Sequence, residues 1–341
     1  MEENRPGEGQ EQIGSDGSGT MDQTVPGRHI RFHGSGASLF GIHVVNILLT
    51  ILTLGIYYFW GKVKVRNYIY SQSEFEGDRF AYHGTGKELL LGWLRAILIM
   101  AVAFAILFGL FYLFGKNPAE SLVLIYLLFL PFLFLGLIPI AIVGAWRYRL
   151  SRSSWRNIRF SFRGSTKDFL KLYAPGLLLT MITLGLYSPY FEIRLLKFLL
   201  DRSYFVTSSF HFDGNGRDLF PHFLVAFLLL PFTLGLSMFW YAARQHRYCW
   251  SHTRFEGAQF HSTMTGGSLL WLHLVNGFLV MITLGLGTPW VVVRTARFMF
   301  ERTSLHGPLD LSSVVQAARD AEATGTGEGI ADLLDMDLGI L

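Results

Sequence analysis

Long apolar segments without charge are the feature of this sequence that most limits its fold. Six runs of about 20 residues contain no Asp, Glu, Lys or Arg, and they lie at 39–60, 96–114, 121–146, 172–191, 222–242 and 270–292. A helix rises about 1.5 Å per residue, so such a run reaches across about 30 Å of hydrocarbon. The sequence therefore predicts an all-α, multi-pass membrane protein with about six transmembrane helices.

Composition agrees with a membrane setting. The chain is 51% hydrophobic and 16% charged, whereas soluble proteins carry about 25% charged residues. The net charge of +4 comes from Lys and Arg clusters beside the ends of the apolar runs, where anionic lipid headgroups attract them. Membrane lipid is thus the expected partner, and nucleic acid is not. Because Cys249 is the single cysteine, no internal disulfide is expected.

Both ends of the chain differ from the middle. Residues 1–30 are rich in Gly, Glu, Gln and Ser, a composition typical of disordered tails. Residues 306–341 form a second predicted tail, flexible and acidic, which leaves 31–305 as the repeat-built transmembrane domain. The last segment, Ala331 to Leu341, mixes acids with leucines, so it is either a solvated tail or a short amphipathic peptide that docks on a protein partner.

A Thr-Leu-Gly motif recurs inside four of the six apolar runs, which indicates that one structural unit was duplicated. Two interpretations stay open: close packing of helices at the glycine, or a kink in a helix that lines a site, as in transporters. Pro189 and Pro289 follow two of the motifs. Proline can kink a helix, but packing explains the motif equally well. The candidate kink residues are Thr53, Gly55, Thr183, Gly185, Thr233, Gly235, Thr283 and Gly285.

The repeated units end in two ways. In the first type the predicted helix closes with Phe-Trp, at Phe59-Trp60 and Phe239-Trp240. In the second type it closes with Pro and an aromatic residue, at Pro189-Tyr190 and Pro289-Trp290. The two types alternate along the chain, as expected if successive units cross the membrane in opposite directions. We therefore expect an inverted repeat of single crossings, with the run at 96–114 as an insertion.

Aromatic residues alternate with small or polar ones in the connecting loops. Phe75 to Phe80 and Phe255 to Phe260 each place a glycine turn between aromatic residues, which is a hairpin pattern. The sequence predicts short interfacial β-hairpins, with Gly77 and Gly257 at turn positions of positive φ. Irregular loops with aromatic anchors are the alternative.

Taken together, these motifs resemble a known family. The run from Phe40 through Asn46 and Thr53-Leu-Gly to Trp60, followed by Phe75-Glu-Gly-Asp-Arg-Phe80 and the segment to Leu90, is similar to the YjgN family of bacterial inner-membrane proteins, whose function is unknown. The resemblance covers about residues 30–305, and the tail from Gly327 also looks similar. It implies a location in the bacterial cytoplasmic membrane and gives no catalytic residue.

Polar side chains are rare inside the apolar runs. His43 with Asn46, and His273 with Asn276, form matching pairs one helical turn apart in the first and last units. We predict that the four side chains form one intramembrane cluster that binds a ligand or lines a path. The alternative is that they hold helices together or reach the headgroup region.

The same runs contain no carboxylate, which argues against ion-coupled transport and intramembrane hydrolysis. No catalytic residue, metal site or cofactor is predicted. We expect a protein that is not an enzyme, either a small-solute conduit or transporter-like bundle, or a structural or assembly component of the cell envelope. A membrane enzyme ranks third.

Overall fold

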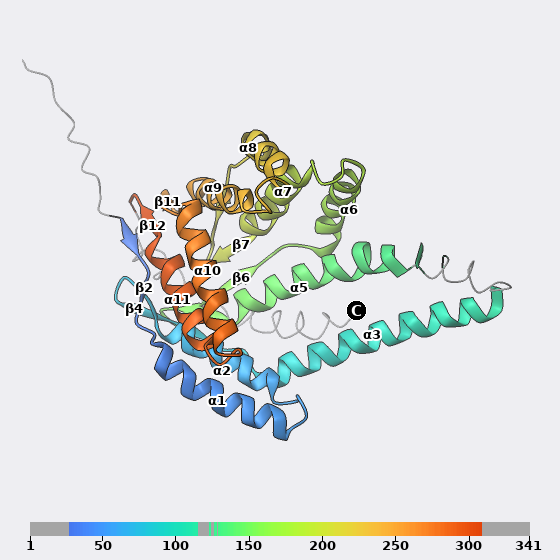
Figure 1. Cartoon of the computed structure of the whole chain (residues 1–341), viewed down its shortest axis with the longest axis horizontal. Helices are drawn as coiled ribbons and strands as arrows, with labels where there is room; N and C mark the ends of the chain where they lie inside the picture. Colours follow the sequence, from blue (N-terminus) through green and yellow to red (C-terminus); the bar gives the residue numbers. More distant parts are fainter. Residues whose placement is uncertain (1–26, 115–122, 124–125, 128, 309–341) are drawn as a thin grey trace, which may run out of the picture.

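The computed structural model describes residues 27–114, 123, 126–127 and 129–308 (Figure 1). It consists of repeated units, each a pair of helices followed by a β-hairpin or its equivalent. The helix pairs are α1 (Gly36–Leu52) with α2 (Tyr58–Ser71), α3 (Gly86–Phe114) with η1 (Phe132–Leu137) and α5 (Ile138–Ser151), α6 (Thr166–Ile182) with α7 (Ser188–Asp201), α8 (Gly216–Leu229) with α9 (Ser237–Ser251), and α10 (Gly266–Ile282) with α11 (Thr288–Glu301).

Short strands connect these pairs. They are β1 (Arg28–His29), β2 (Arg31–Phe32), β3 (Ser73–Phe75), β4 (Asp78–Tyr82), β5 (Ser153–Trp155), β6 (Ile158–Phe162), β7 (Ser203–Phe205), β8 (Ser208–Ser209), β9 (His211–Phe212), β10 (Thr253–Phe255), β11 (Ala258–Ser262) and β12 (Thr303–His306). The predicted tail segments 1–26 and 309–341 lie outside the described residues.

The Thr-Leu-Gly motif ends one helix and starts the return of the chain. The Thr53 hydroxyl donates to the Leu49 carbonyl oxygen at 2.7 Å and accepts from the Tyr57 N–H at 2.9 Å. Leu54 and Gly55 then take positive φ values of 51° and 94°, a left-handed conformation that terminates helices. The same hydroxyl bond and left-handed pair recur at Thr183, Thr233 and Thr283. The predicted kink is therefore a full reversal between two helices.

Strand pairing shows where each helix pair returns. The last residue of the strand before a pair lies opposite the first residue of the strand after it, as in Phe32 with Ser73 and Tyr82 with Ser153. The same register holds for Phe162 with Ser203, Phe212 with Thr253, and Ser262 with Thr303. Since neighbouring strands alternate in direction, all these helix pairs leave the strands at one end.

This arrangement corrects the predicted inverted repeat. The runs 39–60, 172–191, 222–242 and 270–292 each contain a reversal instead of one continuous helix, so successive units do not alternate in direction. Hydrophobicity concealed the reversal because the turn residues are themselves apolar and exposed: Leu54 is 94% exposed and Leu284 is 93% exposed.

The strands close into a ring. One sheet has the order β1-β12-β11-β10-β9 and the other β2-β3-β4-β5-β6-β7-β8. Ile30 lies between β1 and β2, and Phe210 lies between β8 and β9, so at both places one extended segment passes from one sheet to the other. Arg28 in β1 lies opposite Leu305 in β12. The two ends of the predicted domain thus meet, and the folded part extends to Arg28 and His306.

Two of the predicted hairpin turns are confirmed. In β3–β4, Glu76 and Gly77 have φ values of 51° and 82°, and in β10–β11, Glu256 and Gly257 have values of 48° and 77°. Two consecutive positive φ values define the type I′ turn, whose twist matches that of paired strands. What the aromatic alternation did not indicate is that the hairpins pair with one another.

A Gly77→Val variant is expected to lose about 1–3 kcal/mol of unfolding free energy, because a β-branched residue is strained at positive φ. No atom lies within 4 Å of the position a Cβ would take, so the loss would report backbone strain alone. Gly41→Val is the matched control, since that helical glycine also faces open space. Thermal unfolding in mild detergent measures both, and equal midpoints for the two variants would contradict this assignment of strain.

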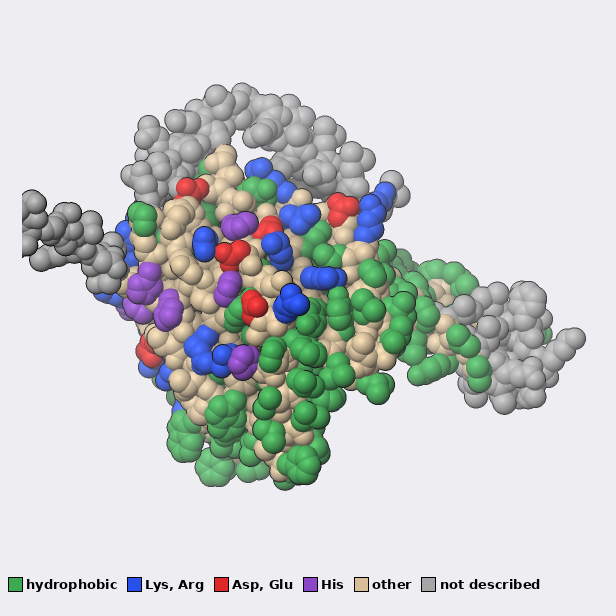
Figure 2. Space-filling model, turned by 90° about the horizontal axis from the view of Figure 1, so that it is seen from above, with side chains coloured by type: hydrophobic (Ala, Val, Ile, Leu, Met, Phe, Trp, Pro, Cys, Tyr) green, Lys and Arg blue, Asp and Glu red, His purple; other side chains and the backbone are tan. Residues whose placement is uncertain are grey.

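One helix pair is much longer than the others. Gly86–Gly109 and Phe129–Ser151, with 24 and 23 residues, are apolar and long enough to cross a membrane. They overlap the predicted runs at 96–114 and 121–146. In Figure 1 they project as an arm beyond the rest of the molecule. Figure 2 shows hydrophobic side chains over this arm and over the lower part of the view, whereas charged side chains gather in the upper part.

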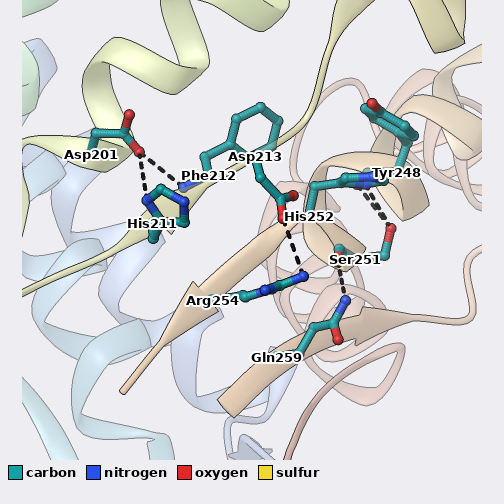
Figure 3. A network of polar contacts seen from close by, with 9 residues as sticks. All are labelled: Asp201, His211, Phe212, Asp213, Tyr248, Ser251, His252, Arg254 and Gln259. Carbon is teal, nitrogen blue, oxygen red and sulfur yellow. Dashed lines mark hydrogen bonds and ion pairs between the residues drawn. The ribbon is translucent and has the colours of Figure 1, made fainter. Parts of the chain in front are cut away.

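Polar contacts fix the units to each other near the strands. Arg147 donates to the Gly164 carbonyl oxygen at 2.9 Å, and Arg297 donates to that of Gly34 at 3.1 Å. The second bond joins the last unit to the first. Where β9 meets β10, Asp213 pairs with Arg254 at 3.2 Å (Figure 3). These bonds anchor the helix ends to the ring.

Candidate functional site

Aromatic side chains from the strands line a cavity of about 370 Å³. Each hairpin supplies two residues five positions apart, because both flank the turn and point to the same face of the pleated strands. The ends of α9 and α11 contribute His246, Trp250, Met299 and Phe300. The residues from the strands and from the links between them are Arg28, Ile30, Phe75, Phe80, Trp155, Phe160, Phe205, Phe210, Phe255, Phe260, Thr303, Ser304 and Leu305.

The rings in this wall contact one another across the strands. Phe160 and Phe205 have centroids 4.9 Å apart, Trp155 and Phe205 5.8 Å, and Phe210 and Phe255 4.8 Å. Such separations and tilted geometries are favourable for aromatic pairs. Trp155, Phe205 and Phe255 are buried, so this cluster both holds the ring together and forms an apolar surface toward the cavity.

One charged group also lines the cavity. The Nε atom of Arg28 lies 3.4 Å from the Glu76 carboxylate across the strands. Its Nη1 atom is buried and has no hydrogen-bond partner within the described residues. A buried donor without a partner costs free energy.

His246 belongs to the wall as a neutral group. Its Nε2 atom accepts from the Trp250 indole N–H at 2.9 Å, and its Nδ1 atom lies 3.0 Å from the Ser262 hydroxyl. Burial, helped by the positive charge of Arg247, lowers the pKa of His246 below its usual value, so the imidazole stays uncharged at neutral pH. Since both ring nitrogens are engaged, His246 shapes the cavity and leaves the charge there to Arg28.

The four residues of the predicted polar cluster lie on two helix pairs, α1–α2 and α10–α11. The Asn46 amide donates to the Gly61 carbonyl oxygen at 3.3 Å, within α1–α2, and the Asn276 amide donates to the Thr295 hydroxyl at 3.1 Å, within α10–α11. His273 contacts the Leu269 carbonyl oxygen of its own helix at 2.8 Å. His43 is half-buried.

The contacts of the described residues thus place each asparagine inside its own pair, as packing would. Asn46 is buried opposite Gly61, where a Cβ on the glycine would lie only 3.1–3.3 Å from the asparagine side chain. None of these contacts joins His43 or Asn46 to His273 or Asn276 in the described part of the chain. A shared cluster therefore stays a prediction.

Comparison with known proteins places the chain in a family. The sequence profile of a family described as "Bacterial protein of unknown function (DUF898)" matches residues 28–239 and again 222–333. The chain belongs to this family. The two overlapping matches together cover the whole ring of strands and all the helix pairs.

Curated relatives carry the name inner membrane protein YjgN, so the resemblance noted in the sequence is confirmed. The chain is 34% identical to the Escherichia coli K12 protein over 148 residues, which are 43% of this chain and 34% of the relative. It is 30% identical to the Salmonella typhimurium LT2 protein over 158 residues, 46% of this chain and 37% of that relative. The matched stretch spans about a third of these relatives' length. No solved structure gave a significant match.

These relatives are inner-membrane proteins, which supports membrane association of the DUF898 chain. The aromatic residues that line the cavity recur five positions apart along the chain, at 75/80, 155/160, 205/210 and 255/260. The aromatic alternation predicts interfacial β-hairpins, but nothing local in the sequence indicates that separate hairpins pair side by side. The site was therefore visible as a pattern but not as a cavity.

Proposed function

We propose that α3 and α5 cross the bilayer and that the four shorter helix pairs enter it from one side to about half its depth. A 24-residue helix is about 36 Å long and exceeds the hydrocarbon thickness of about 30 Å. In the third unit, the uncharged part of α6 runs only from Leu172 to Ile182, about 16 Å. Since the chain reverses there, the ring of strands would lie at one membrane surface.

We further propose that the protein is not an enzyme and acts as a conduit or carrier for a small, mainly apolar solute that bears one anionic group. The observation that carries this proposal is the aromatic cavity, whose lining includes the side chain of Arg28, which pairs with Glu76. A volume of about 370 Å³ falls in the range of small-molecule sites. Apolar walls with one placed charge would orient such a solute.

The character of the wall argues against passage of hydrated ions. An ion that enters must exchange its hydration shell for polar groups, and ten of the thirteen lining residues from the strand ring offer aromatic or aliphatic side chains instead. A transporter-like role is therefore proposed for an organic solute only.

A structural or assembly role in the cell envelope is the alternative. An apolar groove between α6 and the segment of η1 and the residues before it, lined by Leu130, Phe134, Pro175 and Leu178, has a volume of about 520 Å³ and offers a surface for another membrane protein. This role would give co-purifying partners and no solute binding, and the following experiment separates the two.

Binding of 2-naphthoate to the protein in nanodiscs tests the proposed function. This probe joins an aromatic body to one carboxylate, and calorimetry with empty nanodiscs as the blank measures its affinity. We expect saturable binding at one site per chain. Arg28→Gln should weaken binding by about tenfold, since a hydrogen bond to a charged group contributes about 1.5–3 kcal/mol.

The neutral analogue 2-naphthylmethanol provides the matched control. Its affinity should change little in the Arg28→Gln variant, because no charge pairing is lost. No binding of either probe, or an equal effect of the variant on both, would overturn the proposed anionic solute and favour the structural role.

A further inference from the structure

A second groove lies where the ring of helices closes. It runs between α1 of the first unit and α10–α11 of the last, with a volume of about 1190 Å³, and we call it the seam groove. Phe40 and Trp290 face each other in its wall at 5.1 Å between ring centroids. The remaining lining includes Val275, Phe278, Ile282, Leu284, Arg294 and Arg297.

The lining changes from apolar to cationic along the groove. Ile282 and Leu284 lie at the reversal, and Phe278 lies one turn back along α10. Arg294 and Arg297 lie on α11 about 9 and 14 Å from its first residue, as the helical rise gives. A molecule with an apolar chain and an anionic head would match both parts of the groove.

Arg294 differs from its counterparts in two other units. At equivalent positions, Lys64 lies over the Tyr57 ring at 5.4 Å and Arg194 lies over the Tyr187 ring at 5.8 Å. The residue that corresponds to these tyrosines in the last unit is Gly287, so Arg294 has no such ring to cover. No hydrogen bond or ion pair of Arg294 occurs among the described residues, and its side chain lines the groove.

We propose that the seam groove binds one anionic phospholipid, with its phosphate at Arg294 and an acyl chain along α10 toward Leu284. The basic groups at the same level in the other units would lie at the same headgroup depth. Trp290 suits this boundary, since tryptophan gathers at membrane interfaces. The lipid would seal the joint between the first and last units, which Arg297 and Gly34 bridge only near the strands.

Native mass spectrometry of the full chain tests this site. The protein is exchanged into nanodiscs of two compositions, one of phosphatidylcholine with phosphatidylglycerol and one of phosphatidylcholine alone. It is then released from the nanodiscs, and the lipid that stays bound is identified. We expect one phosphatidylglycerol per chain, preferred over phosphatidylcholine by at least about fivefold, as one basic residue near anionic lipid contributes. Arg294→Gln should abolish the preference.

Arg244→Gln is the matched control, because Arg244 is the equivalent residue on α9 and does not line the seam groove. It should leave the preference unchanged. Val275→Trp, which fills the groove, should reduce retention of both lipids, and thermal unfolding checks that each variant is folded. Equal retention by Arg294→Gln and the natural protein, or a second copy of the chain bound in place of lipid, would overturn the proposal. These variants should leave naphthoate binding to the aromatic cavity unchanged, so failure of the lipid proposal would not affect the proposed function.

Discussion

Replacing Trp155 with Ala is expected to lower the unfolding free energy by about 3–5 kcal/mol, the range for large aromatic residues in cores. Trp155 is 3% exposed and contacts Phe75, Phe80 and Phe205. The space left by the indole would join the cavity of about 370 Å³, so the surrounding rings could not move in to fill it. A loss of this size approaches the whole unfolding free energy of a marginally stable protein.

The loss has two parts, the packing of the aromatic ring and the hydrogen bonds of the indole N–H. The Trp155 N–H donates to the Phe75 and Asp78 carbonyl oxygens at 3.2 and 3.3 Å. Trp155→Phe keeps an aromatic ring but loses these bonds, and should cost about 1–2 kcal/mol. Denaturant unfolding in mild detergent, followed by circular dichroism, measures both variants. Equal stability of Trp155→Ala and the natural protein would show that the aromatic wall does not hold the ring together.

Placing a carboxylate at the reversals is expected to have a comparable effect. Leu54 and Leu234 are 94% and 93% exposed at the ends of their helix pairs. If these ends lie at the bilayer midplane, each Leu→Asp change costs about 3–4 kcal/mol. The two changes lie in separate helix pairs and should add. The double variant should therefore lose most of its folded yield in the membrane fraction.

The outcome distinguishes half-depth insertion from full crossing. If the reversals emerged in water on the far side, Asp at either position would be harmless. Leu54→Ala is the control for loss of side-chain volume and should change the yield little. In a Cys249→Ser background, Leu54→Cys should resist a membrane-impermeant maleimide from both sides, whereas Glu76→Cys in the β3–β4 turn should react from one side. Labelling of Leu54→Cys in intact cells would contradict half-depth insertion.

The sequence by itself determined the features that depend on composition or on a few neighbouring residues. Uncharged apolar runs indicated a membrane protein, and the recurrence of the Thr-Leu-Gly motif indicated a repeat. Gly77 was predicted at positive φ because glycine between strand-like segments favours the I′ turn. These properties are local, so no knowledge of distant residues was needed.

Tertiary structure decided the path of the chain and the site. Lipid can surround a reversal as well as a helix, so apolar residues at Leu54 gave no sign that the run turns back. Ring closure depends on pairs such as Arg28 with Leu305 and Arg297 with Gly34, which no local pattern specifies. The aromatic residues form a cavity only once the hairpins pair side by side, because the pleat points each pair inward only within a closed ring of strands.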